Sequence, residues 1–200
     1  MYLMIKEKIT HEIVVDKSRF IATLFPIQNL KEFQETLDEV KKTYYKADHH
    51  TYAYIIDEVE KGSDDREPKG SAGKNYLSFF KYQKLNYVGV IVTRFFGGKL
   101  LGAGNLSRTY LKALEETFKL AKTSQVIKAR EYSVLVEYDL YDIFANYLKK
   151  YSFNVKDLAF NDKIRIVFIA PLEFEEDLES LFIKKVIIEK NLVINYIKEN

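Results

Sequence analysis

The sequence contains no cysteine, which excludes disulfide bonds, a thiolate nucleophile and a cysteine-type zinc site. It also lacks any apolar run approaching the roughly 18 residues that a membrane-spanning helix needs. Residues 1–15 have no apolar core long enough for a signal peptide. We therefore expect a cytoplasmic protein with no membrane partner.

Acidic residues are absent from one long internal segment. Between Glu67 and Glu115 there is no Asp or Glu, whereas the segment carries Lys69, Lys74, Lys81, Lys84, Arg94, Lys99, Arg108 and Lys112. Glycine is confined in a similar way, because none occurs after Gly104. The net charge of +2 says little about partners. The local imbalance indicates that any binding chemistry is concentrated in this segment.

Hydrophobic periodicity predicts an α+β protein of two domains, residues 1–125 and 126–200. In the first domain the patterns predict two strands over 11–27 around a turn at 16–18, strands at 51–59 and 86–96, and helices at 30–45, 74–85 and 106–124. Residues 60–73 combine Gly, Pro, Ser and Asp, which is typical of a loop.

The second domain has no glycine and follows a linker predicted at 122–128. Its patterns predict strands at 130–138, 153–160, 163–170 and 191–199, with helices at 141–151 and 173–185. This βαββαβ order is that of the ferredoxin-like fold.

The segment "RFFGGKLLGAGNLSRTY", residues 94–110, is the strongest candidate for an anion site. A glycine-rich turn that leads into a helix presents backbone N–H groups and the positive end of the helix dipole. The predicted phosphate-binding residues are Lys69, Lys74, Arg94, Gly97, Gly98, Lys99, Gly102, Gly104 and Arg108. A structural alternative stays open, in which the glycines shape a turn and a closely packed helix start, and Arg94 pairs with a nearby acid.

Two nucleotide motifs fail in this segment. A Walker A loop needs Lys and Ser or Thr after its last glycine, where this chain has Ala103 and Gly104. A Rossmann fingerprint needs a third glycine, where this chain has Ser107.

A second group of residues could form a polar site, and consists of His49, His50, Asp64, Asp65, Glu67 and Ser71. These side chains include metal ligands and general bases. Adjacent histidines in a strand point to opposite faces, however, and Ser71 is not in a G-x-S-x-G setting. We expect no metal, no cofactor and no assigned catalytic residue.

Four segments in order resemble the signatures of the YigZ/Impact family: "KSRFIA" at 17–22, "ADHHTYAY" at 47–54, "SDDREPKGSAG" at 63–73 and "VIVTRFFGGKLLGAGNLSRTY" at 90–110. The resemblance implies an N-terminal Impact domain with a ribosomal protein domain 2-like fold, also similar to a domain of elongation factor G, and a ferredoxin-like second domain. It further implies a translation-linked regulatory protein that binds nucleic acid.

The chain departs from the family pattern in two places. Arg66 stands where the family usually has glycine, and Asn105 and Ser107 replace residues typical of the helix start. Asn105 is predicted to cap the helix.

Three functions remain open from the sequence. The first is binding of RNA or the ribosome through the basic, glycine-rich surface, beside aromatics such as Tyr82 or Phe96. The second is an enzyme or sensor for a small phosphorylated metabolite. The third is an adaptor for a translation factor or another regulatory protein.

Overall fold

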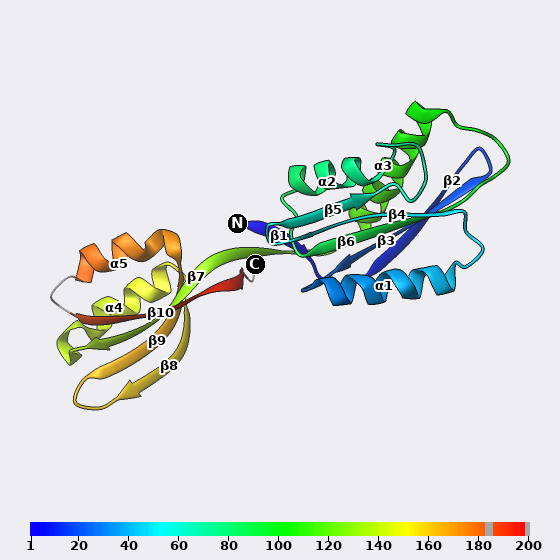
Figure 1. The fold of residues 1–200 in the computed structure, drawn as a ribbon. Coiled ribbons are helices and arrows are strands. Elements are labelled where there is room, and N and C mark those ends of the chain that lie inside the picture. The colour runs from blue at the N-terminus through cyan, green and yellow to red at the C-terminus, as the bar shows by residue number, and fades with distance from the viewer. Residues whose placement is uncertain (183–185, 199–200) are drawn as a thin grey trace. The chain divides into compact units, whose positions relative to one another are not determined.

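The computed structural model describes residues 1–182 and 186–198. The chain divides into two units, residues 1–125 and the residues from Val126 onward (Figure 1). Each unit has its own buried apolar clusters.

The N-terminal unit is an antiparallel sheet with helices on both faces. The strands of this sheet are β2 (Ile9–Val15), β3 (Ser18–Pro26), β4 (His49–Ile56), β5 (Val59–Ser63) and β6 (Val88–Phe95), and the helices are α1 (Leu30–Thr43), α2 (Gly73–Tyr82) and α3 (Ala103–Leu120). The unit also contains the short strand β1 (Tyr2–Ile5), which is not part of this sheet. The sheet order is β2-β3-β6-β4-β5. One face packs on α1, and α2 and α3 cover the other (Figure 1).

Local sequence explains why these elements form. β6 is the central strand and is covered on both faces, which explains its nearly continuous apolar sequence. Val90, Ile91 and Val92 are fully buried. Helix α1 begins with a variant of the capping box. The side chain of the N-cap Asn29 accepts the Glu32 N–H, and the Glu32 carboxylate accepts the N–H of Gln28, the residue before the cap.

The second unit has the ferredoxin-like order predicted from the sequence. It contains β7 (Thr123–Val136, of which the first three residues belong to the other unit), α4 (Tyr141–Lys150), β8 (Asn154–Phe160), β9 (Ile164–Pro171), α5 (Glu175–Phe182) and β10 (Val186–Lys198). The strands lie in the order β10-β7-β9-β8. The α+β fold class is thereby confirmed.

Several predicted boundaries are wrong. The proposed linker 122–128 is strand from Thr123 onward, and its β-branched residues suit that conformation. Residues 60–63 were included in the predicted loop but belong to the edge strand β5. Because this strand is held to β4 by backbone hydrogen bonds and is largely exposed, its sequence does not alternate between apolar and polar residues. The strand at 2–5 was missed, and β10 begins at Val186 instead of residue 191. Part of the helix predicted at 173–185 lies outside the described residues.

Candidate functional site

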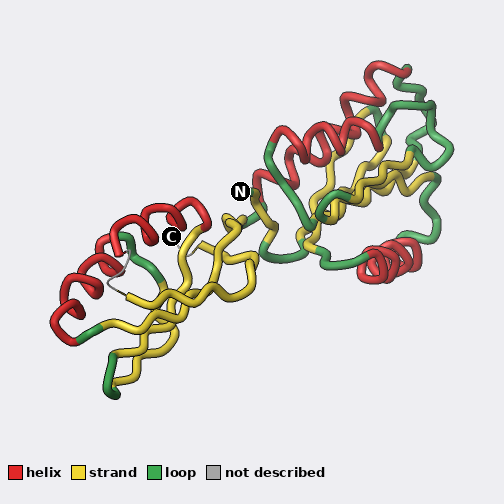
Figure 2. Tube along the Cα trace, turned by 60° about the vertical axis from the view of Figure 1, so that its left-hand side comes forward, coloured by secondary structure: helices red, strands yellow, loops and turns green. Residues whose placement is uncertain are grey.

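The four sequence motifs meet at one end of the N-terminal sheet. β3 and β4 begin at this end, while β5 and β6 finish there. Arg94 near the end of β6 pairs with both Phe20 and His49, and Tyr52 pairs with Ser63. Figure 2 shows the long loops of this unit at the same end. We call it the motif end, comprising residues 16–20, 47–50, 63–75 and 93–112.

A buried ion pair lies beneath the motif end. Glu67 Oε1 accepts hydrogen bonds from Arg94 Nη1 at 2.6 Å and from the Tyr110 hydroxyl at 2.7 Å. The side chains of Glu67 and Arg94 are only 5% and 7% exposed. The Arg94 guanidinium also lies 5.4 Å from the ring centroids of Phe20 and Phe96. Arg94 is therefore held inside the unit by the acid pairing that the structural alternative anticipated.

Burial raises the pKa of the Tyr110 hydroxyl, and its hydrogen bond to Glu67 raises it further. The phenol accordingly stays protonated and donates to the carboxylate. Glu67 thus receives one charged and one neutral donor, which compensates the cost of burying it.

The two histidines bind different partners. His49 Nδ1 lies 2.8 Å from the backbone carbonyl of Asp65, and its Nε2 lies 3.8 Å from Glu67 Oε1. His50 Nδ1 lies 3.0 Å from Thr93 Oγ1, and its backbone N–H donates to the Asp65 carboxylate. Burial lowers the pKa of His50. In residues 1–182 and 186–198, no three His, Asp or Glu side chains converge to hold a metal ion.

Asp64 organises the loop between β5 and α2. Its Oδ2 accepts the Gly70 N–H at 2.8 Å, and its Oδ1 accepts the N–H groups of Ala72 and Gly73 at 2.9 and 3.0 Å. These bonds close the loop onto the start of α2. The carboxylate is therefore committed to backbone partners.

Arg66 occupies the turn with a left-handed backbone, φ = 67°. This conformation suits the glycine that the family usually has here, so the turn tolerates a side chain at some conformational cost. The Arg66 side chain is exposed, with Nε 4.0 Å from Asp65 Oδ1. The substitution adds a surface cation to the motif end.

Ser71 is buried, and its Oγ has no hydrogen-bond partner in the part of the chain that the structure describes. A serine nucleophile needs a base within hydrogen-bond reach. The described geometry gives Ser71 no such base.

The glycines of residues 97–104 serve different purposes. A Cβ on Gly97 would collide with the Lys17 backbone, and the Gly97 N–H donates to Ser18 Oγ. Gly98 and Gly102 have φ of 84° and 74°, a region that favours glycine. A Cβ on Gly104 would meet only the end of the Arg108 side chain, so the close packing expected there is absent.

Helix α3 begins three residues earlier than predicted. Gly102 is its N-cap and supplies no side-chain hydrogen bond. Asn105 is therefore not the cap but lies in the first turn, where its Oδ1 accepts from Arg108 Nη2 at 2.7 Å. The first turn carries no acidic residue, and the N–H groups at a helix start favour negative charge nearby. Ser107 Oγ accepts from Asn75 Nδ2 and thereby links α3 to α2.

Most of the predicted basic residues surround this helix end or the neighbouring loop. Lys69, Lys74, Arg108 and Lys112 are exposed, and none has a carboxylate within 4.0 Å among the described residues. Lys99 is also exposed but pairs with Asp16 at 2.8 Å. A groove of about 210 Å³ is lined by Val15, Asp16, Leu101, Asn105, Arg108, Thr109 and Lys112. The charged residues of this groove are two cations, Arg108 and Lys112, and one acid, Asp16.

Comparison with known proteins agrees with these motifs. The profile of the Impact N-terminal domain family matches residues 16–118. The chain belongs to the Impact family. It is 34% identical over 166 residues to the IMPACT family member YvyE of Bacillus subtilis, covering 82% of this chain and 76% of that protein. It is 28% identical over 171 residues to an IMPACT family member of Haemophilus influenzae, covering 83% of each chain.

A third Impact-family relative, YigZ of Escherichia coli, is 30% identical over 129 residues, covering 62% of this chain and 63% of that protein. The fold also resembles a crystal structure of a hypothetical protein with a TM-score of 0.62 and 22% identity, covering 94% of this chain and 95% of the other. Across residues 1–182 and 186–198, no helix is both long and apolar enough to cross a membrane.

Sequence reasoning missed the part that Tyr110 takes in the site. Its spacing placed it on the apolar stripe of α3, and it is fully buried there. The hydrogen bond that the Tyr110 hydroxyl donates to Glu67, 43 residues away in the chain, is visible only in the structure. Asp16 and Asn75 were missed for the same reason, because their partners are distant in sequence.

Proposed function

We propose that the protein binds RNA, free or within the ribosome, through the exposed cations of the motif end. The observation that carries this proposal is that several cations of the motif end are exposed and unpaired, whereas two of its acids are bonded to groups of the protein itself. Lys69, Lys74 and Arg108 are exposed without a carboxylate partner in the described chain, beside the uncapped start of α3. Asp64 and Glu67 face internal donors instead. Asp16 is paired with Lys99, and exposed cations without such a partner attract a phosphate backbone.

An aromatic side chain lies on the same surface. Phe96 is exposed and follows β6, and its backbone N–H donates to Asp48 Oδ2 at 2.7 Å. Bases of single-stranded RNA stack on such rings. Tyr82 is also exposed but ends α2, at the opposite end of that helix from the motif end. Phe96 therefore supports the proposal and Tyr82 does not.

The resemblance of the four motifs to the family implies domains like those of elongation factor G and a ribosomal protein, and on that basis we propose a regulatory role in translation. A small phosphorylated metabolite has weaker support, because the carboxylates considered as its polar partners already bind groups of the protein itself.

The test is the salt dependence of RNA binding, measured by fluorescence anisotropy with a labelled single-stranded RNA. If five of the exposed cations, Lys69, Lys74, Lys99, Arg108 and Lys112, each contact a phosphate, the expected slope of log K against log salt is about −3.5. In the triple variant Lys69→Gln, Lys74→Gln, Arg108→Gln, the slope becomes shallower by about 2.

The matched control removes three exposed cations from α1, on the other face of the sheet: Lys31→Gln, Lys41→Gln, Lys42→Gln. It is expected to bind RNA nearly as the wild type does. A flat salt response, or equal loss in the two triple variants, contradicts the proposal. Capture of a protein partner that survives nuclease treatment, without RNA affinity, would favour the adaptor function.

A further inference from the structure

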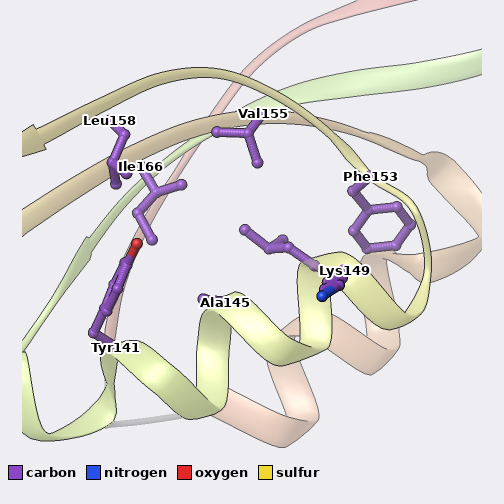
Figure 3. Close-up of a pocket in the computed structure, with 8 residues that line it drawn as sticks. Tyr141, Ala145, Lys149, Phe153, Val155, Leu158 and Ile166 are labelled. Atoms are coloured by element: carbon purple, nitrogen blue, oxygen red, sulfur yellow. The ribbon is translucent and has the colours of Figure 1, made fainter.

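The second unit has an apolar groove that the proposed RNA-binding function does not use. The groove has a volume of about 160 Å³ and is lined by Tyr141, Ala145, Leu148, Lys149, Phe153, Val155, Leu158 and Ile166. Figure 3 shows Val155, Leu158 and Ile166 on the strand side of an open space, with Tyr141, Ala145 and Lys149 on the α4 side. We call it the α4–β8 groove.

The groove is open because α4 leaves the edge strand β8 partly uncovered. Val155, Leu158 and Phe160 pair with Phe168, Ile166 and Ile164, which are buried in the core beneath the helices. Side chains of directly paired residues point to the same face. These three residues of β8 therefore point toward the helix layer, yet they are 45%, 39% and 56% exposed.

A bulge in β8 maintains this arrangement. The register shifts between Val155 and Asp157, so Lys156 is an extra residue in the strand. Without the bulge, Val155 and Leu158 would point to opposite faces, because they are three positions apart. The bulge places both apolar side chains on the groove side. It also interrupts the free edge of β8, which disfavours pairing with another strand.

The charged side chain that lines the groove is basic. It belongs to Lys149, which is exposed near the end of α4. Lys156, the bulge residue of β8, is exposed next to the lining residue Val155 and has no carboxylate within 4.0 Å among the described residues. Asp142 is exposed on α4 but does not line the groove. Asp157 is already paired with Arg165 at 2.7 Å. An occupant that carries acidic groups would complement this rim.

We propose that the α4–β8 groove binds an amphipathic helix of a protein partner, with an apolar stripe on β8 and acidic residues toward Lys149 and Lys156. Drug-sized ligands occupy about 300–1,000 Å³, whereas this groove fits one or two apolar side chains. A helix beside α4 extends the helix layer over Val155, Leu158 and Phe160, and so removes their apolar surface from water.

The probe is a synthetic helical peptide of about 18 residues with leucine at positions i, i+3, i+4 and i+7 and glutamate on its polar face. It is titrated into the isotope-labelled full chain, and binding is followed by amide and methyl NMR shifts. We expect the shifts to centre on Tyr141, Ala145, Lys149, Val155 and Leu158. The twin peptide with lysine in place of glutamate should bind at least about tenfold more weakly.

The variant Leu158→Glu puts an acid into the groove and is expected to weaken binding of the glutamate peptide about tenfold. Its matched control is Ile143→Glu, an exposed residue of α4 that does not line the groove and should leave affinity unchanged. The variant Lys149→Glu should reduce the preference for the glutamate peptide over its lysine twin.

Four results would overturn the proposal. They are an absence of shifts with the glutamate peptide, equal affinity for the two peptides, shifts confined to the outer backbone edge of β8, and self-association of the chain through the groove. Circular dichroism of each variant checks that its secondary structure is retained, and RNA affinity is measured in parallel because it belongs to the other unit.

Discussion

At the scale of single residues, the stability of the motif end depends on the hydrogen bonds that the buried Glu67 carboxylate accepts. Its carboxylate is nearly inaccessible to water and holds Arg94 and Tyr110 together across β6, α3 and the β5–α2 loop. A buried charge is stable only with its partner, so the pair is more sensitive to loss of one member than a surface pair is.

Replacing Glu67 with glutamine tests this dependence. The amide keeps an acceptor but removes the negative charge, which leaves the Arg94 guanidinium buried without compensation. We expect Glu67→Gln to lower the free energy of unfolding by about 3 kcal/mol, measured by urea denaturation. Glu60→Gln, which breaks the exposed pair with Lys81, should cost less than about 1 kcal/mol. Similar losses in the two variants would contradict the buried-pair account.

His50 makes stability depend on pH. Because burial lowers its pKa in the folded state, the unfolded chain binds a proton more readily as the pH falls below about 6.5. This contribution to stability is complete above that pH and is lost as the pH drops toward the folded pKa.

The free energy of unfolding should therefore fall between about pH 7.5 and about pH 5.5, and His50→Gln should reduce that fall. Urea titrations at both pH values measure it, with His11→Gln on β2 as the control. An unchanged pH dependence in His50→Gln would show that another group is responsible.

At the scale of elements, the turn from β6 into α3 is built from glycines with unequal roles. Gly97 lies against the backbone of the β2–β3 turn, while Gly104 lies in the first turn of α3 with only the end of the Arg108 side chain nearby. The same substitution should have opposite effects at the two positions.

Gly97→Ala is expected to destabilise the protein by about 2 kcal/mol, because the new methyl group meets backbone atoms of Lys17 that cannot move away easily. Gly104→Ala should be neutral or slightly stabilising, since alanine favours helix and the nearest atoms are the mobile Arg108 guanidinium nitrogens at 3.8 and 4.0 Å. Thermal unfolding by circular dichroism measures both. Equal effects would show that close approach is not what requires Gly97.

At the scale of the whole molecule, each unit contains its own apolar core. The clusters around Phe20 and Phe33 lie within residues 1–125, and the cluster around Phe168 lies within the second unit. Each of these clusters is therefore made of residues of a single unit.

We expect a fragment of residues 1–125 to fold alone and to retain the salt-dependent RNA affinity of the full chain. Its amide NMR spectrum should overlay on that of the full chain for residues of the motif end. A collapsed spectrum would show that the first unit requires the second, whereas a folded fragment without RNA affinity would move the binding surface elsewhere.

The sequence by itself determined the fold class, the family and the region where the motifs lie. Helical and strand periodicities are local properties of the chain, and the βαββαβ order can be read from them directly. The family rests instead on the resemblance of four short segments, which are also local stretches of sequence. Strands with weak patterns escaped this reasoning: β5 is a short polar edge strand, and the first part of β7 resembled a linker.

Only the tertiary structure decided which charges are available. The sequence leaves open whether Arg94 binds an anion or pairs with an acid, whereas the structure brings it against Glu67 of the β5–α2 loop and leaves Lys69 exposed. The uncovered face of β8 is likewise invisible in the sequence, because it depends on a bulge and on where α4 packs. Burial and pairing arise from contacts between distant segments, and a linear pattern does not contain them.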